Sequence, residues 1–532
     1  MRNLKKLFNH QQIKIDLERL VEVGLLLTIV LMIILPVFKF YLIGFSKGDI
    51  NELYQAVKQT LSISICVVGI VTPLSMICAF GVTYTNIKNK SLFSVLCILP
   101  FFLPPISFGF SLLLNFGKNG IVYCLFGIRI PLMGKLGIII GHFFYAFPPA
   151  FLMFRNAMQS TNSTLYENAV LLGIPLRKYI IRILFPQIKK TIVAVIFSVM
   201  LLSMTEYTIC LVVGGRVKTL ALLIYRQVSG SMDFSAAAVM GFLLAIPLIL
   251  LIIVNILSPN TMITITYKKL SVPIDKRRDH ICCIFLFGIS CIFFLSIFSF
   301  LIAGFVEGYE LNVSFTLKHV IQVFRMPYAK YYINSIIIAS LTSLFGSILA
   351  FFCAYYAWKG KSMLVKRLFY AISVTPQMIP GLIYGISYML FFKGTVIYNS
   401  LTILVMVNIA HFFASPFLYS YQSFAQLGEE LGEIIKLYGI PWQCAIRDIY
   451  FPCFYTTLSN MFFFFFINAM ITISAVVFLY TARTMPYSVL LNNFEGSLEY
   501  LNKASAVSFI ILSTNILVSM GGLVIKKVGT KQ

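Results

Sequence analysis

The chain has 532 residues, of which 59% are hydrophobic and only 11% are charged. Soluble globular proteins carry about 25% charged residues. A chain of this length cannot bury so much apolar surface in one core, so soluble, disordered and fibrous classes are excluded. The formal net charge of +24 fits nucleic-acid binding as well as a membrane protein, and the placement of the basic residues has to decide between them.

Twelve stretches are long and apolar enough to cross a membrane. In chain order they fall near 20–43, 60–84, 93–115, 136–156, 191–213, 238–258, 280–303, 333–357, 368–391, 400–420, 457–480 and 504–524. Backbone groups in lipid must be hydrogen-bonded within their own segment, so we predict an all-α transmembrane fold of about 12 helices. The first stretch is too long for a cleaved signal peptide.

Most of the 42 Lys and Arg lie at the two chain ends and in alternate loops between these stretches. Such an excess marks the cytoplasmic side of a membrane protein, so we expect both termini in the cytoplasm. The positive charge is therefore a signal of membrane orientation. It requires no nucleic-acid partner, and the expected surroundings are membrane lipid.

Two cytoplasmic loops repeat one pattern at half the chain length. Gly173-Ile174-Pro175 and a later Pro186 recur as Gly439-Ile440-Pro441 and Pro452, at a constant offset of 266. Other repeated residues pair Pro100 and Pro104 with Pro376 and Pro380, and His142 with His411. We therefore predict two parallel six-helix repeats, 1–265 and 266–532, related by an axis along the membrane normal.

Each repeated loop, 165–190 and 429–456, is predicted to fold as two short helices joined at a glycine. Glycine commonly ends a helix and proline commonly begins one, so Gly-Ile-Pro reads as the turn between them. Two such helix–turn–helix loops on the cytoplasmic face suit a partner with two-fold symmetry. The alternative is that these helices lie flat on the lipid headgroups.

The loops resemble the EAA motif of permeases in binding-protein-dependent ABC importers. That motif runs Glu-Ala-Ala, three residues, Gly, nine residues, then Ile-x-Leu-Pro. The first loop has Glu167-Asn168-Ala169, Gly173 and Ile183 to Pro186, and the second has Glu433-Ile434-Ile435, Gly439 and Ile449 to Pro452. Departures are Asn168 and Ile434-Ile435 in place of Ala, and Phe185 and Phe451 in place of Leu.

The resemblance implies a fused permease that couples to ATPase subunits through its two loops. The implied coupling residues are Glu167, Ala169, Gly173, Pro175, Pro186, Glu433, Gly439, Pro441 and Pro452. Implied partners are two copies of a cytoplasmic ABC ATPase and a periplasmic or lipid-anchored solute-binding protein, in the bacterial cytoplasmic (inner) membrane. ATP and Mg would belong to the ATPase, leaving this chain without cofactor or catalysis.

The implied solute is ferric iron, because fused permeases are typical of that type and because residues 470–480 resemble the eleventh span of the branch that serves iron and 2-aminoethylphosphonate. Related forms serve 2-aminoethylphosphonate or thiamine. The sequence without the resemblance also allows an ion-coupled secondary transporter, although such carriers need no docking loops. A membrane enzyme is disfavoured by the lack of clustered catalytic groups and of a GxxxxGK[ST] loop.

A carboxylate within a span is costly and marks a candidate functional site. Glu206 in the fifth stretch is such a residue, and the candidates for a translocation path are Glu206, Thr205, Asn468, Thr472 and Ser474. The alternative is that Glu206 pairs with a basic residue such as Arg216. His142 and His411 either serve the path or pack the bundle, and the repeated prolines are either hinges or static kinks. The 5 His and 11 Cys show no spacing typical of a metal site or disulfide.

Overall fold

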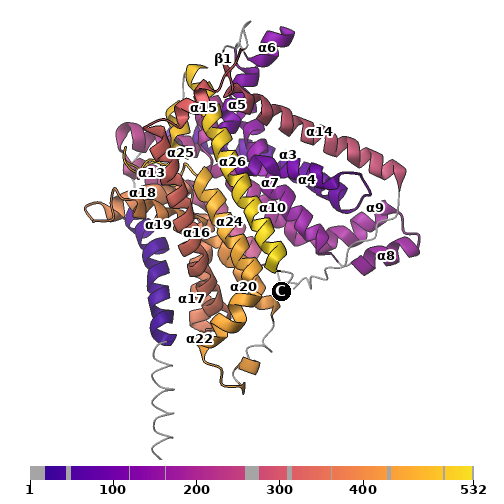
Figure 1. Cartoon of the computed structure of the whole chain (residues 1–532), viewed down its shortest axis with the longest axis vertical. Helices are drawn as coiled ribbons and strands as arrows, with labels where there is room; N and C mark the ends of the chain where they lie inside the picture. Colours follow the sequence, from indigo (N-terminus) through magenta and orange to yellow (C-terminus); the bar gives the residue numbers. More distant parts are fainter. Residues whose placement is uncertain are drawn as a thin grey trace, which may run out of the picture. The chain divides into compact units, whose positions relative to one another are not determined.

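The computed structural model describes most of the chain, and helices dominate the described part (Figure 1). The described residues are 18–42, 50–118, 120–161, 163–257, 275–307, 314–360, 362–427, 433–435, 437–494 and 498–529. The predicted domain boundary at 265/266 and the first residues of the second loop, 429–432, lie outside these ranges.

Seven described helices are long and apolar enough to span a membrane: Glu18–Tyr41, Ile50–Thr83, Lys135–Gln159, Leu176–Thr205, Lys276–Ala303, Tyr328–Lys359 and Tyr500–Gly522. Three bent pairs raise the number to 10: Lys90–Phe102 with Ile106–Phe126, Leu401–Phe412 with Ala414–Gln426, and Ala445–Cys453 with Tyr455–Ile471. Shorter apolar helices, Phe234–Pro247 and Gly381–Phe392, occupy predicted stretches six and nine. The transmembrane helical class is thus confirmed, while the count of twelve stays a prediction.

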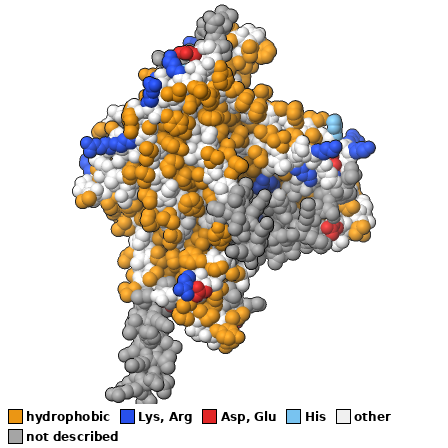
Figure 2. Space-filling view, in the orientation of Figure 1, with side chains coloured by type: hydrophobic (Ala, Val, Ile, Leu, Met, Phe, Trp, Pro, Cys, Tyr) orange, Lys and Arg blue, Asp and Glu red, His pale blue; other side chains and the backbone are white. Residues whose placement is uncertain are grey.

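The spans expose large apolar side chains, as a lipid-facing surface requires. Leu27, Ile65, Leu295 and Phe345 are 62%, 63%, 65% and 55% exposed, and each lies on a candidate span. Figure 2 shows that hydrophobic side chains cover much of the visible described surface, with Lys and Arg gathered in a few places. Apolar patches of this extent are not stable against water, so they indicate contact with lipid.

The chain divides into two compact units that do not coincide with its sequence halves. One unit contains residues 1–44, 329–489 and 513–532, and the other contains 45–328 and 490–512. The first helix of each half has thus joined the unit built mainly from the opposite half. The duplication itself concerns sequence, so the two predicted domains stay a prediction.

In its described residues, the unit of 45–328 and 490–512 holds nineteen complete helices, helical turns and strands. They are α3 (Ile50–Thr83), α4 (Lys90–Ile98), η2 (Leu99–Phe102), α5 (Ile106–Phe116), α6 (Ile121–Phe126), α7 (Lys135–Gln159), α8 (Ser163–Leu171), α9 (Leu176–Tyr179), η3 (Ile180–Leu184), α10 (Phe185–Thr205), α11 (Thr208–Val213), α12 (Leu220–Arg226), η4 (Gln227–Ser231), α13 (Phe234–Leu257), α14 (Lys276–Ala303), β1 (Val306–Glu307), β2 (Ser314–Phe315), α15 (Lys318–Val323) and η7 (Leu491–Phe494). Figure 1 shows α14 beside α3 and α4. Ser111 on α5 donates a hydrogen bond to the Ser296 carbonyl of α14 at 2.6 Å, which ties α14 into this unit.

The other unit is built mainly from the second half. Its elements are η1 (Val30–Ile34), α2 (Leu35–Tyr41), α16 (Tyr328–Lys359), α17 (Met363–Val374), η5 (Thr375–Met378), α18 (Gly381–Phe392), α19 (Leu401–Phe412), α20 (Ala414–Gln426), α22 (Trp442–Cys444), η6 (Ala445–Tyr450), α23 (Phe451–Cys453), α24 (Tyr455–Ile471) and α25 (Tyr487–Leu490). The Tyr388 hydroxyl of α18 donates to the Met32 carbonyl at 2.7 Å, so the N-terminal helix packs here. The long helix α26 (Leu498–Gly529) contributes residues to both units.

Five predicted stretches are not continuous straight helices, and this corrects the sequence prediction. Stretches three, five, nine and eleven are interrupted, and stretch ten bends by 54° between Phe412 and Ala414. Stretches three and nine each break at a short 3₁₀ turn that contains the first of the paired prolines, η2 with Pro100 and η5 with Pro376. Proline removes a backbone donor and crowds the preceding turn, so a break there has a physical cause. In stretch eleven, α24 ends at Ile471 and residues 472–480 form turns rather than helix.

A two-stranded antiparallel pair is a second departure from the all-helical expectation. β1 pairs with β2 in the register Val306 to Phe315 and Glu307 to Ser314. Lys318 lies 2.7 Å from Glu307 and lowers the pKa of that exposed carboxyl group. This short strand pair lies between α14 and α15 in the chain and leaves the helical class unchanged.

Candidate functional site: the duplicated loops

The first loop has the predicted helix–turn–helix form. α8 ends at Leu171, and Gly173 adopts a left-handed conformation with φ of 65°. The Ile174 amide donates to the Ala169 carbonyl at 2.9 Å, and the Gly173 amide donates to the Val170 carbonyl at 3.0 Å. These two bonds form a Schellman motif, which satisfies the last carbonyl groups of a helix and favours glycine.

The second loop repeats this turn. Gly439 has φ of 62°, and the Ile440 amide donates to the Ile435 carbonyl at 3.1 Å, the equivalent of the bond at Ile174. Each turn is followed by a short helix and then by a π-helical turn, η3 in the first loop and η6 in the second. The repeat therefore extends from sequence to backbone conformation.

The repeated prolines occupy similar places in both loops. Pro175 is the N-cap of α9 rather than its first helical residue, with φ of −63° and ψ of 142°. Pro186 and Pro452 each lie in the first turn of the helix after the π-helical turn, α10 and α23. Proline fits there because the first helical amides have no acceptor within the helix.

Each loop presents two exposed apolar side chains just before its glycine. Leu171 and Leu172 are 83% and 76% exposed, and their repeat equivalents Leu437 and Tyr438 are 85% and 76% exposed. The inward-facing residues Ala169 and Ile435 are both 3% exposed. Exposed apolar pairs at matching positions form a candidate contact surface, for a partner protein or for the lipid headgroups. Sequence reasoning missed these four residues, although the same offset would have found them.

Of the two acidic residues in the motif, Glu433 is exposed and Glu167 is partly buried. Glu167 lies one residue after the buried Tyr166, and Glu433 begins the short described helical segment 433–435. Both glutamates therefore lie on the helix that precedes the glycine turn.

The candidate path residues lie at two matching helix ends. α10 ends at Thr205 and Glu206 is extended, with φ of −83° and ψ of 121°. α24 ends at Ile471 and Thr472 is extended in the same way, with φ of −67° and ψ of 141°. Glu206 and Thr472 are related by the repeat offset, so both halves break a long helix at the same position.

Glu206 is 7% exposed and is held by its own turn. Its Oε1 atom accepts hydrogen bonds from the Thr208 amide at 2.7 Å and the Thr208 hydroxyl at 2.5 Å. Among the described residues Glu206 forms no ion pair, and Arg216 is exposed, so the suggested pairing of these two residues is not found. Glu206 is thus a buried carboxyl group placed where the helix is interrupted.

The other path candidates make mostly local contacts. Thr205 donates to the Leu201 carbonyl at 2.9 Å, and Asn468 donates to the Phe464 carbonyl at 2.8 Å. Ser474 lies against the backbone of Gly381, where a Cβ atom would meet the serine hydroxyl. Thr205 and Glu206 lie in one compact unit and Asn468, Thr472 and Ser474 in the other, so their convergence on one path stays a prediction.

The repeat-related histidines have different surroundings. His142 Nδ1 lies 3.0 Å from the Ser203 hydroxyl, whereas His411 Nδ1 has no hydrogen-bond partner among the described residues. The position that matches Ser203 is Ala469, which explains the difference. In the described ranges no group of three or more His, Cys, Asp or Glu is placed to hold a metal ion.

Comparisons with known proteins give one family and several relatives. Residues 71–263 match the family model described as binding-protein-dependent transport system inner membrane component. The chain is 25% identical over 501 residues to the ferric transport system permease protein FbpB of Actinobacillus pleuropneumoniae, covering 87% of this chain and 72% of that protein. It is 23% identical over 500 residues to a Haemophilus influenzae protein provisionally named as FbpB 1 of a ferric transport system, covering 87% and 78%. It is 27% identical over 176 residues to the thiamine transport system permease protein ThiP of Brucella suis, covering 32% of each chain.

Proposed function

We propose that the chain is the permease subunit of an ATP-driven importer, because residues 71–263 match the model of an inner membrane component of binding-protein-dependent transport systems and two ferric transport permeases align with 87% of the chain. The observation that carries the proposal is the pair of matching loops, each with a left-handed glycine and an exposed apolar pair before it. An importer of this class needs one docking element for each of two ATPase subunits. Two equivalent loops on one chain supply that number.

Each loop docks into one copy of a cytoplasmic ABC ATPase. Leu171 and Leu172, or Leu437 and Tyr438, enter an apolar groove on the ATPase, because exposed apolar pairs gain the most from being covered. Glu167 and Glu433 lie on the same helices and contribute polar contacts at the edge of the groove. ATP and Mg bind to the ATPase, and a periplasmic or lipid-anchored binding protein supplies the solute.

The twelve predicted stretches form two parallel six-helix repeats, with both termini in the cytoplasm. The repeated helix breaks at Glu206 and Thr472 flank the translocation path, and Thr205, Asn468 and Ser474 contribute polar groups to it. Broken helices suit such a path because their free backbone groups are tolerated where they line a cavity. These breaks directly follow the helices that leave the docking loops, so movement of the ATPase subunits reaches them first.

The proposed solute is ferric iron. The relatives that align with 87% of this chain carry ferric transport in their names, whereas the thiamine relative aligns with 32%. A buried carboxyl group at Glu206 suits a cationic solute. Thiamine and 2-aminoethylphosphonate are the alternatives for the same machinery.

The test is solute uptake by proteoliposomes that contain the chain, its ATPase and its binding protein. We expect ferric iron to accumulate only when ATP and the binding protein are both present. Uptake of thiamine or 2-aminoethylphosphonate under the same conditions would replace iron as the solute and keep the class. Uptake driven by an ion gradient without ATP would contradict the class and favour a secondary transporter.

A further inference from the structure

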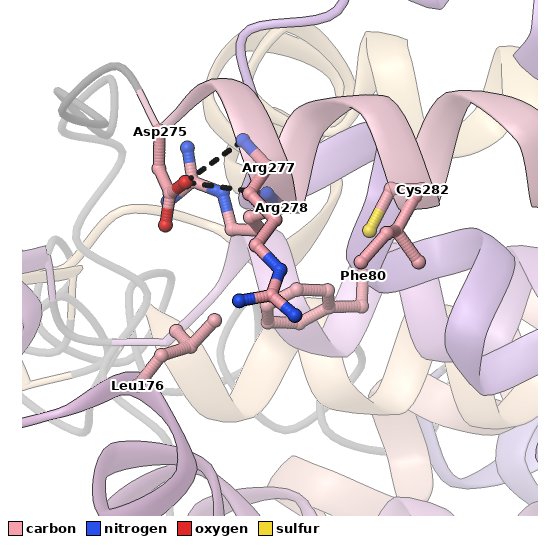
Figure 3. A pocket seen from close by; sticks show the side chains of 7 residues that line it. Phe80, Leu176, Asp275, Arg277, Arg278 and Cys282 are labelled. Carbon is pink, nitrogen blue, oxygen red and sulfur yellow. Dashed lines mark hydrogen bonds between the residues drawn. The ribbon is translucent and has the colours of Figure 1, made fainter.

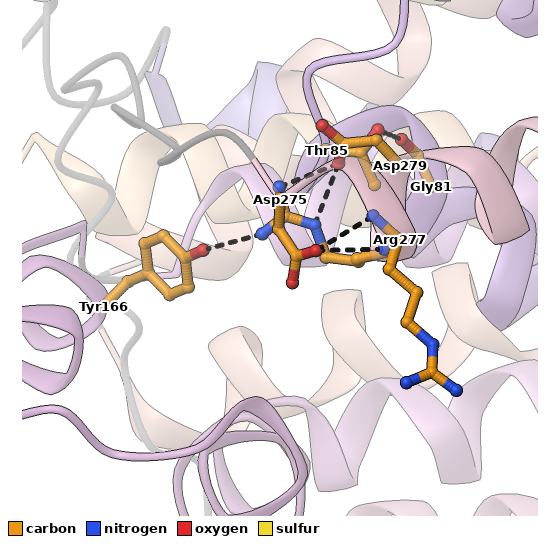
Figure 4. A network of polar contacts seen from close by, with 7 residues as sticks. Gly81, Thr85, Tyr166, Asp275, Arg277 and Asp279 are labelled. Carbon is orange, nitrogen blue, oxygen red and sulfur yellow. Dashed lines mark hydrogen bonds and ion pairs between the residues drawn. The ribbon is translucent and has the colours of Figure 1, made fainter.

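The start of α14 makes a polar link to the first docking loop. Asp275 caps α14 by accepting hydrogen bonds from the amides of Arg277 at 3.1 Å and Arg278 at 3.2 Å (Figures 3 and 4). A side-chain cap of this kind stabilises the first turn of a helix. The cap therefore fixes the backbone from which the Arg278 side chain projects.

The Arg278 side chain is almost buried and fully engaged. It is 8% exposed, and it donates from Nε at 2.9 Å and from Nη2 at 2.8 Å to the same Asp279 carboxylate oxygen. Its Nη1 atom donates to the Tyr166 hydroxyl at 3.5 Å. A guanidinium group has five N–H donors in a fixed plane, so one residue can neutralise its charge on Asp279 and still reach a second partner.

Tyr166 carries this link into both helices of the loop. It is 3% exposed and immediately precedes Glu167 on α8, and its ring meets the rings of Tyr84 at 5.3 Å and of Tyr179 on α9 at 5.0 Å. The Tyr179 hydroxyl donates to the Tyr84 hydroxyl at 3.4 Å, and Tyr84 lies 2.6 Å from the Thr161 hydroxyl. Burial raises the pKa of the Tyr166 phenol, so it stays neutral at working pH.

A pocket of about 360 Å³ lies beside this network (Figure 3). Phe80 of α3, Leu176 of α9 and residues between 275 and 282 at the start of α14 line it. α9 is therefore not packed tightly against α14 on this side. The contact between α14 and the loop runs instead through Arg278 and Tyr166 on α8.

The second loop is held differently. Tyr450 of η6 packs against Tyr355 at 5.7 Å and Phe424 at 5.8 Å, and the hydroxyls of Tyr355 and Tyr450 have no hydrogen-bond partner in the described part of the chain. The position that matches Tyr166 is Gly432, which lies outside the described residues and cannot supply a phenol. The two loops are thus alike in backbone and different in anchoring.

We infer that Arg278 is a positioning residue for ATPase coupling, which holds Tyr166 so that displacement of the first loop also moves α14. This inference rests on the proposed docking function. It makes the two loops unequal, because the first is linked to α14 through a buried hydrogen-bonded ion pair. The described part of the second packs through aromatic rings, with the Lys359 ammonium over Tyr355 and Tyr450. α14 therefore receives movement from the first loop in addition to spanning the membrane.

The test compares Arg278→Gln and Tyr166→Phe with the matched control Arg277→Gln. Arg277 is one residue away on the same helix and carries the same charge, but its side chain is exposed. We expect the first two variants to bind the ATPase normally and to lose about fivefold or more in solute transported per ATP hydrolysed, the lower end of usual coupling between sites. The control should keep the wild-type ratio.

A double-mutant cycle separates positioning from general stability. If Arg278 acts through Tyr166, the double variant Arg278→Gln/Tyr166→Phe should be no worse than the worse single variant. Additive losses, or a wild-type ratio in Arg278→Gln, would overturn the inference. Failure of the wild-type chain to bind any ATPase would instead overturn the proposed function, so the two failures are distinguishable.

Discussion

Gly173→Ala is the sharpest probe of the first docking loop. Gly173 has φ of 65°, and a Cβ atom there would meet no atom within 4 Å. The substitution therefore introduces conformational strain without a steric clash. A left-handed conformation costs a residue with a Cβ atom about 1–2 kcal/mol, which shifts the population of the turn by about 5- to 30-fold.

The strain should appear as lost coupling, because the turn sets the angle between α8 and α9. We expect Gly173→Ala to bind the ATPase about 5- to 30-fold more weakly than the wild type, matching the shift in the turn. The assay is binding of purified ATPase to the chain in lipid nanodiscs, together with ATP-driven uptake. The matched control is Gly127→Ala, since Gly127 has φ of 67°, equally open surroundings and no place in either loop. Equal binding by Gly173→Ala and the wild type would refute the reasoning, and an equal loss in Gly127→Ala would assign the effect to general stability.

Three further predictions concern the docking surfaces and the path. Gly173→Asp should leave the chain folded, since the space around it is open, and yet uncouple ATP hydrolysis from uptake; normal uptake by this variant would argue against a coupling role. Leu437→Asp should weaken ATPase binding about tenfold or more, because it places a charge on the exposed apolar pair of the second loop. Leu295→Asp, on the lipid-facing side of α14, should instead impair membrane insertion. Pull-down of the ATPase and the yield of protein in the membrane distinguish the two effects. Glu206→Gln should lower uptake of a cationic solute and leave ATPase binding unchanged. Unchanged uptake would indicate that Glu206 has only a structural role.

Hydropathy located the spans because the requirement for about 20 apolar residues is imposed by the bilayer itself. It failed at residues 472–480, which are as apolar as a span and yet form turns. Hydropathy reports burial or lipid contact, and it cannot distinguish a buried turn from a buried helix. The matching break at Glu206 shows that the interruption belongs to the repeat and is not a local accident.

The conformation of the two repeated loops was predictable because glycine and proline have few conformational roles. A glycine between two polar helical segments, followed by proline, predicts the observed left-handed turn at Gly173 and at Gly439. The exchange of first helices between the compact units was not predictable, since an apolar helix does not specify its neighbour. The link from Arg278 to Tyr166 was also hidden, because it joins residues 112 positions apart.

The most direct test of the account is the number of ATPase subunits bound by one chain. Native mass spectrometry of the complex, purified in mild detergent, should show two ATPase copies per chain. The combined variant Gly173→Asp/Leu172→Asp should retain one copy, and the equivalent Gly439→Asp/Tyr438→Asp should also retain one. A complex with no ATPase, or one in which neither variant loses a subunit, would contradict the claim that the duplicated loops are the docking sites.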